Sequence, residues 1–379
     1  MSAEPPVPET GVLAIASHVV SGNVGNKIAV FVLQSMGCDV AALNTVQFSN
    51  HTGYKQWKGS RVSAQEITEL WEGLKQSYLD NFDMMLSGYV PGAAAVEAVG
   101  NIGKELKEKS KAKPGSFFWV LDPVMGDNGR LYVADDVVPA YKSLIPYADL
   151  ILPNQFEAEL LSGVKISDSA SLERAIEVLH QKYGVPHIVL TSVSTPLSAS
   201  QTPSLAPSRA QSPTPSQSAS PAYTRTMSVV GSTMTADRRP RPFKIAFPVF
   251  DAYFSGTGDM FAALMVVRMR EAVYHNNPAN DGARVRDTPS WLSADAVEAR
   301  DLPLARAAEK VLASMHEVLA RTCASMGAEL GEAVAKRGGE KDLDEKTMLL
   351  LRSRASELRL SRNLGCLREP RVEYRAEKL

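Results

Sequence analysis

The residues best suited to chemistry stand together in Gly256-Thr257-Gly258-Asp259, directly before a stretch of helical character. Two glycines allow backbone N–H groups to face one point, and the following helix presents the positive end of its dipole there. Such a junction predicts an anion hole suited to phosphate or to a phosphoryl group in transfer. Asp259 stands beside it and could accept a proton from an attacking hydroxyl. The structural alternative is an acid that stabilises the first helical turn by about 0.3–1 kcal/mol.

Three further carboxylates follow predicted strands. Asp122 and Asp127 belong to the run DPVMGD, and Glu157 belongs to NQFE. Oxygen ligands of this kind suit Mg²⁺, which commonly uses one or two carboxylates together with phosphate oxygens. Like charges placed close together also favour a cation. The sequence therefore predicts a Mg²⁺ site at these acids, with three separately solvated loop acids as the alternative.

Polar residues also follow the other predicted strands. In chain order they are Ser17-His18, Gln47–Tyr54, Tyr89, Asp122–Asp127, Asn154–Glu157 and Thr191-Ser192. In an open parallel sheet, ligands bind outside the carboxyl ends of the strands. We therefore expect these residues to line one groove.

Six short apolar runs predict the strands that would position these residues: Val12–Ser17, Val40–Val46, Met84–Tyr89, Phe117–Asp122, Leu150–Pro153 and His187–Ser192. Helical patterns lie between them. Ser63 and Glu66 form a capping box, and an apolar stripe over Leu172–Leu179 is followed by Gly184. This alternation predicts an α/β fold, a doubly wound and mostly parallel central sheet with helices on both faces.

Composition excludes several classes of protein. With 44% apolar residues, 22% charged residues and a net charge of −1, the chain is neither wholly disordered nor strongly attracted to nucleic acid or an anionic membrane. Cys38, Cys323 and Cys366 are too far apart for a zinc finger or a disulfide framework. The first residues do not predict a signal peptide, and no apolar run reaches about 18 residues. We expect a cytoplasmic protein, a nuclear presence also being compatible, with no nucleic-acid or membrane partner.

The domain organisation follows from changes in composition. Residues 194–242 are rich in Ser, Thr and Pro and predict a disordered insertion; a solvated loop is preferred over a phosphorylated regulatory tether. Residues 12–193 and 243–335 would form one domain. Residues 1–11 would be a flexible N-terminus, and the charged segment 336–379 would pack on the domain.

Seven blocks, in a fixed order, resemble the eukaryotic pyridoxal kinase family of ribokinase-like fold. They are ASHVVSGNVGNK, NTVQFSNHTGYKQWKG, LSGY, LDPVMGDNGRLYV, LPNQFEAELLSG, LTS and FSGTGDMFAA. The resemblance covers roughly residues 12–192 and 243–328. It implies ATP-dependent phosphorylation of the 5′-hydroxymethyl group of pyridoxal, and of pyridoxine and pyridoxamine, giving pyridoxal 5′-phosphate in vitamin B6 salvage.

The resemblance also assigns roles to individual residues. It implies that Asp259 is the catalytic base. The implied vitamin-binding residues are Ser17 and Thr52, which hydrogen-bond the pyridine substituents, and Val24, Val46 and Tyr89, which form the walls. The implied contacts of ATP and its phosphates are Asp122, Asn154, Glu157, Thr191, Ser192, Gly256, Thr257, Gly258 and the flap residue Tyr132. The implied metal ligands are Asp122, Asp127 and Glu157.

The family further implies ATP with Mg²⁺, K⁺ as an activator, and a homodimer. One departure is Leu152, where the family often has a Thr that contributes to the monovalent-cation site. Two alternatives stay open. A hydroxymethylpyrimidine kinase would share GTGD, although QFSNHTGY favours the pyridoxal branch. A non-catalytic regulator would be expected to have lost the base or the metal acids, yet Asp259, Asp127 and Glu157 are all present.

Overall fold

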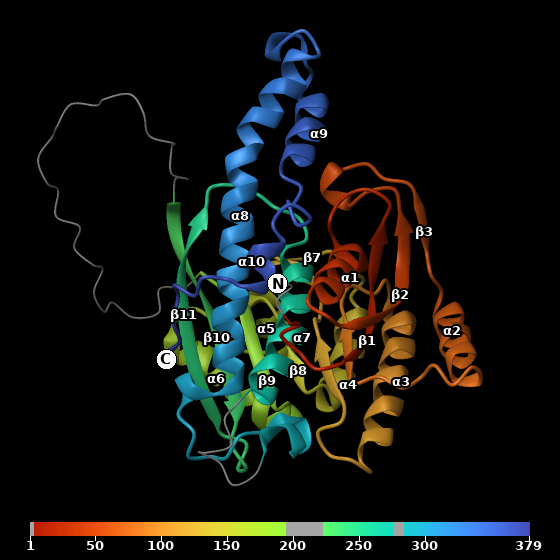
Figure 1. Ribbon diagram of the computed structural model, residues 1–379, viewed down its shortest axis with the longest axis vertical. Helices are drawn as coiled ribbons and strands as arrows, with labels where there is room; N and C mark the ends of the chain where they lie inside the picture. The colour runs from red at the N-terminus through yellow and green to blue at the C-terminus, as the bar shows by residue number, and fades with distance from the viewer. Residues whose placement is uncertain (1–3, 195–222, 276–283) are drawn as a thin grey trace, which may run out of the picture.

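The apolar runs of the sequence form the centre of one ten-stranded sheet (Figure 1). The structure is a computed structural model that describes residues 4–194, 223–275 and 284–379, with side chains from residue 226 onward in the second range. The strands of this sheet are β1 (Gly11–Val19), β2 (Asp39–Phe48), β3 (Gly59–Arg61), β4 (Met84–Ser87), β5 (Phe118–Leu121), β8 (Leu150–Ile151), β9 (His187–Val193), β10 (Tyr223–Met234), β11 (Pro240–Phe250) and β12 (Glu377–Lys378). A separate small hairpin pairs β6 (Gly126–Asp127) with β7 (Arg130–Leu131).

The strand order is β12-β11-β10-β9-β8-β5-β4-β1-β2-β3. The six strands from β2 to β9 run parallel, whereas β3 and the three strands beyond β9 are antiparallel. β2 and β4 lie on opposite sides of β1, so the chain reverses its winding direction there. The predicted doubly wound fold is confirmed, and its switch point lies beside the carboxyl end of β1.

Helices cover both faces of the sheet. They are α1 (Gly25–Ser35), α2 (Ala64–Gln76), α3 (Ala93–Ser110), α4 (Val137–Leu144), α5 (Gln155–Ser162), α6 (Ser169–Tyr183), α7 (Thr257–Tyr274), α8 (Pro303–Ala335), α9 (Glu345–Ala355) and α10 (Leu364–Arg368). Alternate residues of β1 pack into different cores. Val12 and Ala14 join the core under α1, α7 and α8, whereas Leu13 and Ile15 join the core under α2 to α6. The strand period of two therefore divides the apolar residues between two helical layers.

The predicted helix ends are present in the structure. Ser63 caps α2 by accepting a hydrogen bond from the backbone N–H of Glu66 at 3.1 Å, which is one of the two hydrogen bonds of the predicted capping box. Gly184 ends α6 with φ 67°, in the left-handed region that favours glycine. Among the described residues, no helix is both long and apolar enough to cross a membrane.

Two boundary predictions are wrong. The predicted disordered insertion 194–242 includes β10 and the first residues of β11. These two strands pair antiparallel, with Tyr223 opposite Phe250 and Met234 opposite Pro240, and β10 pairs with β9. Residues 195–222 lie outside the described residues. The described part of the predicted flexible N-terminus, residues 4–11, is packed, because Val7 is buried in the core and the N–H of Asp39 donates to the carbonyl of Thr10 at 2.9 Å.

The C-terminal segment packs on the rest of the chain. Leu358, Leu360 and Leu367 are buried in the core under α7 and α8, and β12 pairs with β11 at the edge of the sheet. Arg268 of α7, which is 1% exposed, donates to the carbonyl of Leu367 at 2.5 Å and forms an ion pair with Glu271 at 2.7 Å. A buried guanidinium thus fastens the C-terminal segment to a core helix.

Replacing Arg268 by methionine should lower the free energy of unfolding by about 3–5 kcal/mol, because buried partners lose their donor. Urea titration followed by circular dichroism measures this change. The matched control is Arg306→Met, which removes a half-exposed ion pair with Asp301 and should cost less than about 1 kcal/mol. Equal losses in the two variants would contradict the anchoring role.

Candidate active site

The GTGD junction lies against the loop that follows β1. Gly256 precedes α7 with φ 82°, and a Cβ built on it would come within 2.1 Å of the Asn23 carbonyl oxygen. Only glycine combines this backbone conformation with so close an approach. The first turn of α7 is therefore held directly against a loop more than two hundred residues earlier in the chain.

Asp259, the predicted base, lies in the first turn of α7 and is half-buried. Burial raises the pKa of its carboxyl group, and a hydrogen bond from the backbone N–H of Gly25 opposes this shift. Gly25 itself lies against Ser17, because a Cβ there would meet the Ser17 hydroxyl oxygen at 2.3 Å. The structure thus brings the predicted base and a predicted vitamin-binding residue to one place.

Other predicted vitamin-binding residues lie in the same part of the sheet. Val24 immediately precedes α1, Thr52 opens the 3₁₀ turn η1 (Thr52–Tyr54), and Val46 is buried near the end of β2. Tyr89 follows β4, and its backbone carbonyl accepts a 2.7 Å hydrogen bond from the Thr45 hydroxyl. The ends of β1, β2 and β4 therefore bring all five predicted positions to one edge.

Glu157 organises the neighbouring strand ends through both of its oxygens. Oε1 accepts from the backbone N–H groups of Met125 at 2.8 Å and Gly126 at 3.3 Å, and Oε2 accepts from that of Asn154 at 2.9 Å. Asn154 completes a capping box for α5 and donates its side-chain amide to the carbonyl of Gly126 at 2.7 Å. One carboxylate and one amide thus tie the loop after β5 to the turn after β8.

The acids at this edge influence one another. Burial, followed by the charges of Glu157 and Asp259, raises the pKa of Asp122 well above its ordinary value. Burial also raises the pKa of Glu157 to about 7, against its three backbone hydrogen bonds. Burial and the surrounding acids, Glu157 first, raise the pKa of Tyr132, although more than half of this flap residue is exposed. A site with several carboxylates and perturbed pKa values is typical of catalysis.

The predicted metal triad is not preformed. In the part of the chain that the structure describes, no three His, Cys, Asp or Glu side chains are grouped to hold an ion. Asp127 is exposed, and its carboxylate accepts from the backbone and side chain of Asn128 at 2.7 and 3.0 Å. The role of Asp122, Asp127 and Glu157 as metal ligands therefore stays a prediction, as do the phosphate contacts of the half-buried Thr191 and Ser192 at the end of β9.

Sequence reasoning missed Glu357, which lies between α9 and α10. Its carboxylate accepts from the backbone N–H of Asn23, from His51 Nε2 and from the Tyr54 hydroxyl, each at 3.0 Å. These partners are about three hundred residues away in sequence, and no local pattern marks their meeting. The aromatic-rich QFSNHTGY block was the only available signal.

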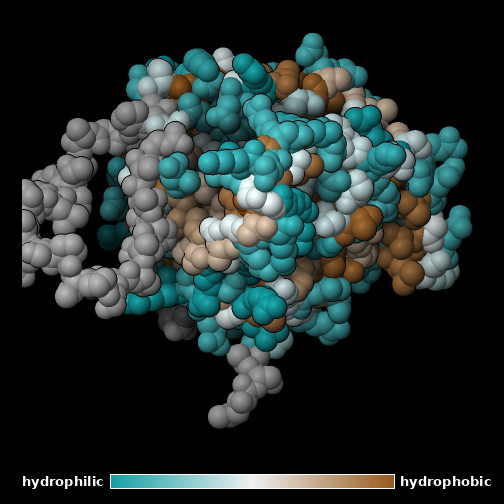
Figure 2. All heavy atoms as spheres, turned by 90° about the horizontal axis from the view of Figure 1, so that it is seen from above, coloured by the Kyte–Doolittle hydropathy of each residue, from teal (hydrophilic) through white to brown (hydrophobic). Residues whose placement is uncertain are grey.

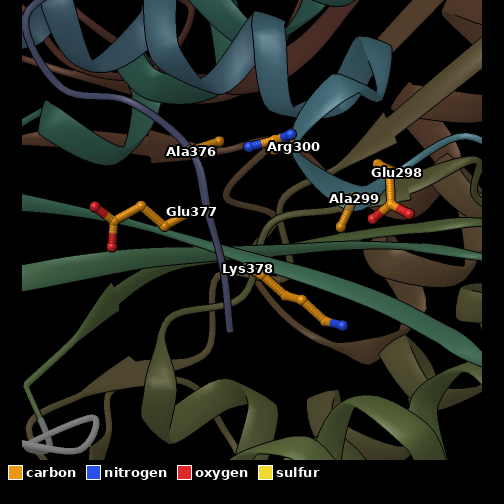
Figure 3. A pocket seen from close by; sticks show the side chains of 6 residues that line it. All are labelled: Glu298, Ala299, Arg300, Ala376, Glu377 and Lys378. Carbon is orange, nitrogen blue, oxygen red and sulfur yellow. The ribbon is translucent and has the colours of Figure 1, made fainter. Parts of the chain in front are cut away.

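A cavity elsewhere on the molecule contains none of the predicted site residues (Figure 3). It measures about 290 Å³ and lies between the 3₁₀ turn η6 (Ala299–Asp301) and β12. Its lining consists of Glu298, Ala299, Arg300, Ala376, Glu377 and Lys378. The perturbed acids, the anion hole and the switch point all favour the strand ends described above.

Comparison with known proteins shows similarity over most of the chain. A family profile described as phosphomethylpyrimidine kinase matches residues 85–215. The chain is 37% identical to a pyridoxal kinase of Ovis aries, over 88% of this chain and 92% of that protein, and 35% identical to one of Homo sapiens, over 86% and 89%. It is also similar to a solved pyridoxal kinase of Leishmania donovani in complex with ADP and pyridoxamine, with a TM-score of 0.69, 28% identity, and coverage of 98% and 100%.

The clustered acids predict a characteristic stability change in Asp122→Asn. A carboxyl group whose pKa is raised in the folded state loses stability as pH rises above its unfolded value, near 3.8. The neutral amide avoids this loss, so the variant should be more stable by about 1–2 kcal/mol at pH 7, and the gain should vanish near pH 4. Urea unfolding at both pH values measures the difference. A variant less stable than the parent at pH 7 would contradict the electrostatic interpretation.

Proposed function

The chain belongs to the pyridoxal kinase family, and on that premise we propose that it transfers the γ-phosphoryl group of ATP to the 5′-hydroxymethyl group of pyridoxal. Pyridoxine and pyridoxamine are the further substrates that we propose, and pyridoxal 5′-phosphate for vitamin B6 salvage is the product. The observation that carries the proposal is the position of Asp259, at the N-terminus of α7 and beside Ser17 and Gly25.

Asp259 acts as the general base in this proposal. It accepts the proton of the 5′-hydroxyl as the oxygen attacks phosphorus, and its raised pKa brings it closer to the working pH than an ordinary carboxylate. The backbone N–H groups of Gly256, Thr257 and Gly258 stabilise the charge on the transferred group. Since little covalent chemistry is required of the protein, positioning and electrostatics supply most of the catalysis.

The residues at the strand ends fit Mg²⁺ bound with ATP. The candidate ligand atoms are all oxygens. Burial beside two further acids raises the pKa of Asp122, and a bound cation would lower it again. Asp122 and Asp127 would hold the ion. Glu157 would orient the loop between them, because both of its oxygens already accept backbone hydrogen bonds. When bound, Mg²⁺ neutralises charge on the phosphate oxygens.

Activation by K⁺ is a separate part of the proposal. Leu152 is 2% exposed and brings no side-chain oxygen to the position that often holds Thr in the family. Any K⁺ at this position would therefore rely on backbone carbonyls. Comparing turnover in KCl with turnover in NaCl tests this part directly.

We propose a cytoplasmic homodimer. Figure 2 shows hydrophobic residues gathered on the side of the molecule that carries β2 and β3. Among the exposed large apolar residues, Val20 follows β1 and donates its N–H to the carbonyl of Phe48, the last residue of β2, at 2.9 Å, and Leu70 lies on α2. An exposed apolar patch of this kind favours association. Light scattering of the purified protein would give its mass in solution.

The activity assay has to distinguish the proposed function from two alternatives. A hydroxymethylpyrimidine kinase would agree with the family profile over residues 85–215. A non-catalytic regulator would bind ligands without turnover. The relatives that cover most of the chain favour pyridoxal, and Asp259 at the start of α7, with its raised pKa, favours catalysis.

Asp259→Asn should lower turnover of pyridoxal by about 10²–10⁴-fold, because the amide cannot accept the proton. Binding of ATP and pyridoxal should change little, since the variant keeps the size and shape of the side chain. ATP-dependent formation of pyridoxal 5′-phosphate by the purified protein measures the first effect, and calorimetry measures the second.

Hydroxymethylpyrimidine in the same assay separates the two enzyme alternatives. Faster turnover of hydroxymethylpyrimidine than of pyridoxal would overturn the proposed substrate. Near-parental turnover by Asp259→Asn would overturn the proposed base, and binding without turnover in the parent would establish the regulator.

A further inference from the structure

We propose that Glu357 is a positioning residue for the vitamin side of the active site, an inference that rests on the proposed function. Its carboxylate is delivered by the C-terminal segment and joins two loops that are separate in sequence, residues 21–25 and residues 51–54. Oε2 accepts from the N–H of Asn23 at 3.0 Å, and Oε1 accepts from His51 Nε2 and the Tyr54 hydroxyl at 3.0 Å each.

The environment of Glu357 keeps it ionised. Its side chain is 18% exposed, and burial by itself opposes the charge. Hydrogen bonds from His51, from the backbone N–H of Asn23 and from Tyr54 outweigh burial and lower the pKa of Glu357. Both oxygens accept hydrogen bonds, so a carboxylate satisfies three donors that no neutral side chain of this length could satisfy together.

Each loop that Glu357 holds also touches the GTGD junction. A Cβ on Gly256 would come within 2.1 Å of the Asn23 carbonyl oxygen, and a Cβ on Gly53 would meet the Ser255 hydroxyl oxygen at 3.0 Å. The N–H of Gly25 donates to Asp259. A shift of either loop would therefore move the surroundings of the proposed base.

The same loops carry residues that we propose contact the vitamin. Val24 follows Asn23 directly, and Thr52 follows His51. An ionised carboxylate can only accept, so the pairing with Glu357 places the hydrogen of the His51 ring on Nε2. In the neutral ring, His51 Nδ1, which is buried and has no protein partner among the described residues, is then an acceptor in the vitamin-side loops. Glu357 thus fixes the position of His51 and, in the neutral ring, its tautomer.

The C-terminal segment is itself fixed by α8, so Glu357 approaches the loops in a defined position. The backbone N–H of Arg359 donates to the Thr322 hydroxyl at 3.3 Å, and the buried side chains of Leu358 and Leu360 pack in the core under α7 and α8. The side chain of Asn23 also donates to the carbonyl of Leu358 at 2.9 Å. In Figure 1, the upper end of α8 extends beyond the body of the molecule with α9 beside it, and the chain returns from α9 toward α10.

Glu357→Gln tests the inference. The amide places an N–H₂ group against one of the three donors, so at least one loop loses its partner. KM for pyridoxal should rise by about 10–100-fold, the range for a lost hydrogen bond to a charged group, whereas KM for ATP should change less than about twofold. Glu357→Asp should recover part of the loss, because the charge is kept and only the reach is shortened.

The matched control is Glu329→Gln, which removes a partly exposed ion pair with Arg359 and leaves in place the backbone hydrogen bond and the buried leucines that hold the segment. Its KM for pyridoxal should stay near that of the parent, and thermal melting should show both variants folded. The ¹⁵N chemical shifts of His51 add a readout that a merely structural role would not move. The Nε2–H tautomer should dominate in the parent and lose its preference in Glu357→Gln.

An unchanged KM for pyridoxal in Glu357→Gln, or equal increases in Glu357→Gln and Glu329→Gln, would overturn the positioning role. Failure of the proposed function is distinguishable, because the parent would then make no pyridoxal 5′-phosphate. In that case hydrogen exchange over residues 21–25 and 51–54 decides the question. Lower protection in Glu357→Gln than in Glu329→Gln supports the role of Glu357, and equal protection refutes it.

Discussion

The site depends on one close approach, between the loop after β1 and the first turn of α7. Gly25 and Gly256 both have positive φ. A Cβ on Gly256 would lie 2.1 Å from the Asn23 carbonyl oxygen of the loop, and a Cβ on Gly25 would lie 2.0 Å from the Ser17 carbonyl oxygen of β1. A side chain at Gly256 would force α7 away from the loop, and one at Gly25 would force the loop away from β1. This contact puts Ser17, Asp259 and the backbone N–H groups of the GTGD turn together, although they come from opposite ends of the domain. The parallel sheet positions these segments, and the glycines allow the short distances between them.

The sequence predicted the parts of this arrangement that local patterns encode. Apolar runs predicted the six parallel strands of the sheet, because strands buried on both faces are continuously hydrophobic. The polar residues at the ends of these strands were therefore expected at one edge of the sheet. Asp259 was identified because it follows two glycines at the start of a helix. β10 was missed because it continues from a segment dominated by Ser, Thr and Pro, whose composition hides the alternation in TMSVVGSTM. Composition averages over a window, whereas strand pairing depends on individual residues.

The role of Glu357 could not be predicted from the sequence, for a different reason. Its three partners come from two loops near the start of the chain, and a carboxylate near the C-terminus carries no mark of such a meeting. The charged segment 336–379 was expected to pack on the domain, but its sequence does not indicate which of its acids face inward. The buried Leu358 and Leu367 fix the orientation of this segment and place Glu357 against the loops. Long-range polar contacts follow from packing, and packing is not visible in one sequence.

Glu157 and Glu357 each hold two segments of the candidate site together, but their surroundings shift their pKa values in opposite directions. Each joins two segments by accepting N–H hydrogen bonds on both oxygens. Burial beside Asp127 raises the pKa of Glu157 to about 7, whereas donors that include His51 lower that of Glu357. The vitamin-side loops are therefore held by a carboxylate that is charged at neutral pH without any ligand. The acids on the other side repel one another, and a cation brought by the nucleotide would stabilise their ionised form and strengthen the hydrogen bonds of Glu157.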